Sequence, residues 1–362
     1  MFLKSIGNFR GIAIIAIVAG HVYSSGFTSN DLFSATIRNL ITGGSSLFVF
    51  ISGFMFHHVF YKKFNYKKFV KNKFQNIGIP YLILATVAIA YLYAFKVEYF
   101  TPLELMRDSA HMYRDGIPFS PSDSDWMTVF KYYLTGRFLI AYWYIPFGLL
   151  LFASAPLHMK FIKQNLKFQI GLVVILSVIA VIVQRPVAGT NAIHSLVYFT
   201  PVYLMGILFS IHNRVITEFL KKNFLMFLLL SVAMSFIQVY LGHVGNYGKP
   251  FFEYNGIDLQ YIQMIFVICF LYGILEKYTF DIPLLTVISE TSFAIYFIHP
   301  WLLMILFKID RRTHHLQDFG AENNIFLYLF TLIVIVLASV SLALLTKRIF
   351  KGSKKSRYLV GY

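Results

Sequence analysis

Long uninterrupted apolar stretches restrict the fold of this chain more than any other feature of its sequence. Residues 325–346 contain no charged side chain, and roughly 20 mostly apolar residues cross the bilayer core as a helix. Stretches that have or approach this character are residues 9–28, 39–60, 76–96, 138–158, 168–185, 192–211, 223–242, 259–276, 284–307 and 325–346. The sequence therefore predicts an all-α polytopic membrane protein with about ten transmembrane helices.

The composition excludes most classes of soluble protein. Hydrophobic residues make up 57% of the chain and charged residues only 13%, whereas an average soluble domain is roughly one quarter charged. The single cysteine, Cys269, excludes a disulfide framework. Only the net charge of +16 would also fit a nucleic-acid-binding protein.

The distribution of the basic residues accounts for that charge. With both termini in the cytoplasm, the cytoplasmic segments hold 21 of the 32 Lys and Arg and three acids, and the outer segments hold 11 basic residues and 12 acids. Because cytoplasmic loops carry an excess of Lys and Arg, the charge indicates topology and leaves a nucleic-acid partner without support. We expect a transmembrane domain over residues 1–347 and a basic cytoplasmic tail over 348–362.

Two predicted loops differ from simple connections. The cytoplasmic loop 61–75 has six lysines interleaved with aromatic residues, which fits either a lipid anchor or a site for a phosphorylated cytosolic ligand. The outer loop 97–137 is long, and its segments 102–115 and 125–134 are predicted to be short interfacial helices. Its acids and aromatic side chains fit sugar binding, and they equally fit a cap on the membrane surface.

Arg10 and His21 are ionisable residues inside or at the edge of the first predicted span. Buried ionisable groups are costly in a bilayer and therefore indicate function. Eleven helical steps of about 100° return to within roughly 20° of the starting direction, with a rise of about 16–17 Å. The two side chains therefore share one face, at a separation comparable to an extended phosphopantetheine arm. The alternative is that Arg10 anchors the helix at the interface and His21 makes a packing hydrogen bond.

Further motifs follow this pair in a fixed order. They are GGSSLFVFISGF at 43–54, FVKNKFQNIGIPY at 69–81, WYIP at 143–146, YFTPVYLMGIL at 198–208 and ISETSFAIYFIHPWLL at 288–303. Together with Arg10 and His21, these motifs resemble acyltransferase family 3, the bacterial integral-membrane O-acyltransferases, over essentially the whole chain. The resemblance implies ten spans, a bacterial cytoplasmic (inner) membrane location and transfer of an acyl group from cytosolic acyl-CoA to a glycan or another acceptor.

The resemblance also implies roles for particular residues. His21 matches the essential histidine, which we expect to act as the general base, and Arg10 matches the arginine that accompanies it at the donor. Lys71 and Lys73 stand where the family often has arginines, and an ammonium lacks the bidentate fork of a guanidinium. We expect an O-acetyltransferase that uses acetyl-CoA and no metal. Its expected partners are a glycan or lipid-linked saccharide acceptor, membrane lipids and other polysaccharide biosynthesis proteins.

Other residues are candidates on weaker grounds. Glu290 is the only acid within a predicted span, and it is expected to orient His21, pair with Arg10 or make a structural contact. His299 follows nine residues later, on the opposite face of the helix, and its His-Pro context predicts a helix break that lines a cavity. Candidate contacts to the substrate, besides His299, are Trp143, Tyr144 and Ser45.

Two other classes of function remain open from the sequence. Buried Arg, His and Glu residues also suit a proton-coupled secondary transporter, although the two halves of the chain show no repeat. A non-catalytic component of a polysaccharide export system is the third possibility. Adjacent histidines at 57–58 and 314–315 lack carboxylates at ligand spacing, so a metal site is not expected.

Overall fold

The computed structural model of the protein describes residues 4–27, 30–95, 119–120, 122–278, 280–313, 323–351 and 354–361. In these ranges, eight helices are long and apolar enough to cross a membrane, and a ninth span results if one bent helix pair is counted. The prediction of an all-helical polytopic membrane protein is therefore confirmed. The first predicted span corresponds to helix α1, which is not among these helices, because its polar residues lower its mean hydropathy.

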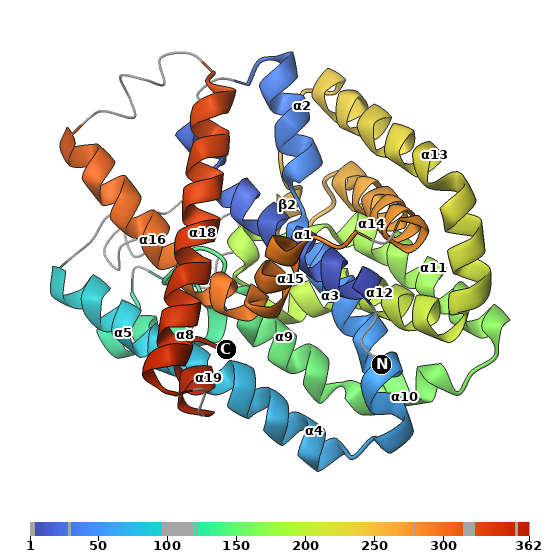
Figure 1. Ribbon diagram of the computed structural model, residues 1–362, viewed down its shortest axis with the longest axis horizontal. Coiled ribbons are helices and arrows are strands. Elements are labelled where there is room, and N and C mark those ends of the chain that lie inside the picture. Colours follow the sequence, from blue (N-terminus) through green and yellow to red (C-terminus); the bar gives the residue numbers. More distant parts are fainter. Residues whose placement is uncertain are drawn as a thin grey trace.

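The helices, drawn in Figure 1, are joined by connections of unequal length. In chain order they are α1 (Lys4–His21), α2 (Leu32–Ile41), α3 (Gly44–Met55), α4 (Tyr66–Lys73), α5 (Ile79–Phe95), α8 (Asp125–Thr135), α9 (Tyr144–Ala153), α10 (Ala155–Ile162), α11 (Leu166–Val183), α12 (Ala192–Ile211), α13 (Asn213–Tyr240), α14 (Leu259–Lys277), α15 (Pro283–Glu290), α16 (Ser292–Thr313), α18 (Ile325–Ile349) and α19 (Lys354–Val360). Two short parallel strands, β1 (Arg185–Pro186) and β2 (Gly248–Lys249), pair with each other.

Three stretches predicted as single helices are broken. The stretch 39–60 is interrupted before α3 at Gly43, whose φ of 91° lies in the left-handed region that glycine tolerates. The stretch 138–158 becomes α9 and α10, bent by 55°, with a proline in the first turn of α10. The stretch 284–307 breaks at Thr291, between α15 and α16. The predicted break at the His-Pro pair is wrong, since α16 continues through Pro300.

Helices α3 and α12 cross closely in the centre of the bundle. A Cβ atom added to Gly206 would collide with the carbonyl oxygen of Phe50, and one added to Gly53 would collide with that of Tyr203. Small residues allow such close backbone approach, which strengthens helix packing in a membrane. Helix α1 packs against α3, α14, α15, α16 and α18 and so lies inside the bundle.

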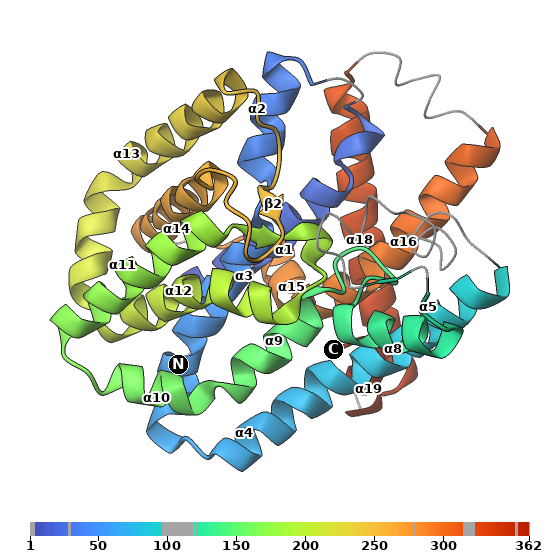
Figure 2. The same cartoon turned by 180° about the vertical axis from the view of Figure 1, so that it is seen from behind.

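The ends of the molecule agree with the predicted topology. Both chain ends lie toward the side of the molecule that carries α4 and α10, whereas α2 and the C-terminal end of α13 lie toward the opposite side (Figures 1 and 2). The helix predicted at 125–134 is confirmed as α8, and the segment 102–115 lies outside the described residues. Helix α19, in the predicted tail, packs against α5, α16 and α18.

Candidate active site

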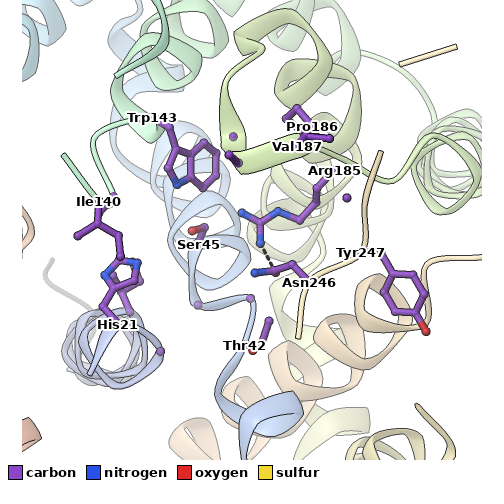
Figure 3. A pocket seen from close by; sticks show the side chains of 18 of the residues that line it. His21, Thr42, Ser45, Ile140, Trp143, Arg185, Pro186, Val187, Asn246 and Tyr247 are labelled. Carbon is purple, nitrogen blue, oxygen red and sulfur yellow. Dashed lines mark hydrogen bonds between the residues drawn. The ribbon is translucent and has the colours of Figure 1, made fainter. Parts of the chain in front are cut away.

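A cavity of about 370 Å³ opens at the end of the bundle that the charge distribution assigns to the outer side. It lies where α1 and α11 end and where α3 begins, and the β1–β2 pair closes one wall. The polar or aromatic residues of its lining are His21, Thr42, Ser45, Arg137, Trp143, Arg185, Asn246 and Tyr247. The sequence-predicted residues His21, Ser45 and Trp143 are thus brought together (Figure 3).

His21, at the last position of α1, is held by a second histidine. Its Nδ1 lies 3.0 Å from Nε2 of His299, a fully buried residue of α16. The two rings are nearly parallel, with an interplanar angle of 8°. The other nitrogen of His299, Nδ1, lies 2.8 Å from the carbonyl oxygen of Ile295, one turn earlier in the same helix.

These contacts determine which nitrogen atoms carry protons. A carbonyl oxygen only accepts, so Nδ1 of His299 is the protonated nitrogen, and in the neutral ring Nε2 is an acceptor. Nδ1 of His21 must then donate to His299, which leaves Nε2 of His21 without a proton. His21, a lining residue of the cavity, therefore has an unprotonated Nε2, as a general base requires.

Arg185, from β1, lies across the cavity from His21 (Figure 3). Its guanidinium carbon is 5.1 Å from the ring centroid of Trp143 and 5.6 Å from that of Phe199, and it donates from Nη1 to Oδ1 of Asn246. Such stacking suits the weakly hydrated guanidinium plane. Trp143 therefore serves to position Arg185 as well as to line the cavity.

Arg137 brings a second guanidinium to the cavity. Its Nε is buried, and among the described residues nothing accepts a hydrogen bond from it. Burial lowers the pKa of Arg137 from its ordinary value, but an arginine remains charged in proteins. No acidic residue belongs to the described lining, so the cavity carries net positive charge.

An acidic group whose charge acts on Arg185 lies outside the cavity lining. Asp258 caps α14 by accepting from the Tyr261 amide at 2.8 Å, and it accepts from the Tyr198 hydroxyl at 2.9 Å. Burial raises the pKa of Asp258 to about 6, while those hydrogen bonds and the charge of Arg185 oppose the rise. Within the described ranges, no ion pair shorter than 4.0 Å joins Asp258 to Arg185.

Toward the other end of α1, Arg10 lies beside Glu290 of α15. Nε of Arg10 donates to Oγ of Ser289 at 3.3 Å, and the Glu290 carboxylate acts on the guanidinium by its charge. Glu290 is exposed at the end of α15, so the structure places it beside Arg10 rather than beside His21. Helix α15 packs tightly here, because a Cβ on Gly11 would lie 2.6 Å from Cδ1 of Leu285.

The two candidate lysines of α4 differ in their surroundings. Lys71 is exposed. Nζ of Lys73 lies 4.5, 5.2 and 5.5 Å from the ring centroids of Phe152, Phe60 and Phe69. The ammonium of Lys73 is thus stabilised by aromatic faces, whereas Lys71 is exposed on the surface of α4.

Tyr144 points away from the cavity that Trp143 lines. It borders a separate small void with Ile17, Phe48, Phe293 and Tyr296, and this void has a volume of only about 10 Å³. The structure therefore separates the two neighbouring aromatic residues that the sequence grouped together.

Arg137 and Arg185 are cavity residues that the sequence reasoning missed. Arg137 directly precedes the predicted stretch 138–158 and Arg185 is the last residue of the stretch 168–185, so the sequence predicts both only as charges at the outer ends of spans. A usable signal was present, since arginines directly at the outer ends of spans run against the positive-inside rule. Asn246 and Tyr247 carried no comparable signal, because they reach the cavity only through the pairing of β1 with β2.

Comparisons with known proteins identify the family of the chain. A family model described as an acyltransferase domain matches residues 3–344, which favours the acyltransferase prediction over a transporter. Searches of curated proteins and of solved structures returned no significant match. In the described part of the chain, no group of three or more His, Cys, Asp or Glu residues could hold a metal ion. The chain belongs to acyltransferase family 3 and is a multi-pass membrane acyltransferase.

Proposed function

We propose that the protein transfers an acyl group, most simply acetyl, from cytosolic acyl-CoA to a hydroxyl group of a cell-surface or exported glycan in the bacterial inner membrane. The observation that carries this proposal is the hydrogen-bond chain from the Ile295 carbonyl through His299 to His21. It holds a neutral imidazole with its free lone pair at a cavity on the outer side.

In the proposed reaction, Nε2 of His21 removes the proton from an acceptor hydroxyl in the cavity. The hydroxyl oxygen attacks the thioester carbonyl carbon, the new C–O bond forms, and the C–S bond breaks when the tetrahedral intermediate collapses. The imidazolium then returns the proton to the departing CoA thiolate, so that protons balance. General acid–base catalysis of this kind contributes about 10²–10⁴-fold to the rate.

Donor recognition is assigned to the opposite end of α1. Arg10 lies about 16–17 Å from His21 along the helix, so it would contact the phosphates of acyl-CoA while the thioester reaches His21. Lys71 and Lys73 add positive charge on α4, at the end of the molecule that we assign to the cytoplasm. Glu290 fits the role of a counter-charge to Arg10, one of the roles that the sequence left open.

The decisive experiment compares histidine variants in a strain that lacks the gene. Mass spectrometry of the surface glycans identifies the acyl group that depends on the gene, and complementation with His21→Ala is expected to leave the glycans unmodified. His58→Ala is the matched control, because His58 is exposed and follows the C-terminal end of α3, whereas the cavity lies at the start of that helix. Both variants must be present in the membrane at the wild-type level. Full glycan acylation by His21→Ala would contradict the proposal.

A further inference from the structure

The chemistry of the outer cavity points to the class of acceptor that it takes. Two guanidinium groups, those of Arg137 and Arg185, face a cavity whose described lining includes no acidic residue. The outer side is expected to be poor in basic residues, so two arginines at one site need a specific cause.

The hydrogen-bonding capacity of both arginines is largely unused. Arg137 has a buried Nε that no described residue accepts from. Among the described residues, the Arg185 guanidinium donates to the neutral amide of Asn246, and the rings of Trp143 and Phe199 stack beside it. A guanidinium carries five N–H donors in a planar fork that matches carboxylate and phosphate oxygens.

The protein itself neutralises the positive charge of these arginines only weakly. Asp258 acts on Arg185 only by its charge, since its oxygen atoms accept from Tyr198 and Tyr261. A buried cation without a counter-ion is unfavourable, so an anion entering the cavity would gain from both guanidiniums. The volume of about 370 Å³ lies within the usual range for small-molecule sites.

We propose that Arg137 and Arg185 bind an anionic group of the acceptor, and that the acceptor is therefore an acidic saccharide. Its carboxylate or phosphate lies at the arginines, and a hydroxyl of the same saccharide or of its neighbour meets His21. Arg185 is close enough for its charge to act on His21, so both groups fall within the reach of one short saccharide. This inference rests on the proposed function, because it names the substrate class of that same site.

The first test is the identity of the acylated sugar in the cell. In the mass spectrometry of surface glycans, the gene-dependent acyl group is expected on a uronic acid, on a phosphorylated sugar or on a residue directly linked to one. An acyl group on a glycan whose repeat contains no acidic residue would overturn the inference while leaving acyl transfer by His21 intact.

The second test measures binding without acyl-CoA, using the purified full chain in lipid nanodiscs. The probes are trigalacturonate and its carboxyl-reduced form, and glucose 1-phosphate and glucose, so that the two pairs distinguish a carboxylate from a phosphate. We expect at least tenfold tighter binding of the charged member of one pair. Equal behaviour within both pairs, including failure of all four to bind, overturns the inference.

Variants then assign the preference to the arginines. Arg137→Gln and Arg185→Gln are each expected to lower the affinity for the charged probe at least tenfold. Arg185→Lys is expected to lower it by a smaller factor than Arg185→Gln. The matched control is Arg38→Gln, because Arg38 lies in the last turn of α2 over the Tyr23 ring and is not among the residues that line the cavity. His21→Ala should bind the charged probe normally, which separates this test from that of the proposed reaction. An unchanged preference in both glutamine variants of the cavity would also overturn the inference.

Discussion

The two ends of α1 are built differently. At His21, the helix ends in an open polar cavity of about 370 Å³. At Arg10, the same helix is packed against α15, with Leu285 in contact with Gly11. The acceptor side of the proposed reaction is thus preformed, whereas the donor side is closed.

A small void marks the boundary between these two regions. Its lining residues Ile17 and Phe48 lie about one helical turn toward the cytoplasm from His21 and Ser45, respectively. The void has a volume of about 10 Å³, roughly the smallest space that admits one water molecule. A phosphopantetheine arm does not fit into this void, so an arm that reached His21 past Ile17 and Phe48 would have to displace these side chains. The contrast between the two ends therefore predicts that His21 is accessible from the outer side without donor, and from the cytoplasmic side only when the donor is bound.

The largest expected effect concerns the support of His21 on the open side. Replacing His299 by Ala removes the acceptor that fixes the His21 tautomer, and the corresponding partners of metal-binding histidines are worth about 10–100-fold. We expect kcat for acyl transfer to fall by about this factor, with KM for acyl-CoA nearly unchanged. His299→Gln, whose amide also donates and accepts, should recover part of the loss. Equal kcat values for His299→Ala and wild type would show that His299 only fills space.

The next prediction tests the boundary itself by cysteine labelling. In a Cys269→Ser background, Ser45→Cys should react with an outside, membrane-impermeant thiol reagent at least about tenfold faster than Phe48→Cys, because local opening costs free energy. Phe252→Cys, on an exposed outer segment, gives the upper reference rate. Acyl-CoA should raise the labelling rate of Phe48→Cys. Similar rates for Ser45→Cys and Phe48→Cys without donor would remove the distinction between the two regions.

A third prediction concerns the closed end. Arg10→Ala should raise KM for acyl-CoA about tenfold, as expected when a hydrogen bond to a charged group is lost, and leave kcat within about twofold. The KM of Arg10→Lys for acyl-CoA should lie between those of the wild type and Arg10→Ala, since lysine keeps the charge but not the planar fork. Arg214→Ala is the matched control, because Arg214 is an exposed arginine at the cytoplasmic start of α13. A fall in kcat without a change in KM would place Arg10 at the reacting atoms instead.

The sequence predicts the helical architecture because a bilayer leaves the backbone few alternatives. Apolar length gives the spans and basic residues give their direction, and both depend on local composition alone. The breaks before α3, between α9 and α10, and at Thr291 were not predicted, because hydropathy does not register a change of direction within an apolar stretch. The error at the His-Pro pair has the same origin, since neighbouring helices can support a proline within a transmembrane helix.

Apart from Ser45 and Trp143, which the motifs of the sequence supplied as candidates, the site was predictable only where it depends on one helix. The spacing of Arg10 and His21 gives their shared face and their separation directly. The contact between His21 and His299 joins residues 278 positions apart, so only the packing of α1 against α16 creates it. Arg185 reaches the cavity through strand pairing with residues 248–249, which hydropathy does not detect.

The smallest expected effect is a dependence of acceptor affinity on pH, which arises from the titration of Asp258. Because burial raises the pKa of Asp258 to about 6, this carboxyl group is protonated below that pH and no longer offsets the charge of Arg185. Affinity for a carboxylate acceptor should then be higher at pH 5 than at pH 7, by about two- to fivefold if the interaction is worth up to about 1 kcal/mol.

Asp258→Asn is the variant that isolates this effect, since asparagine also caps helices well and can still accept from Tyr198. The acceptor KM of Asp258→Asn should stay near the low-pH value of the wild type between pH 5 and 7. A wild-type KM that does not change over this range, or one that changes equally in Asp258→Asn, would mean that Asp258 does not modulate Arg185. The positive charge of the open cavity would then be independent of pH, and the contrast with the closed donor end would be one of packing alone.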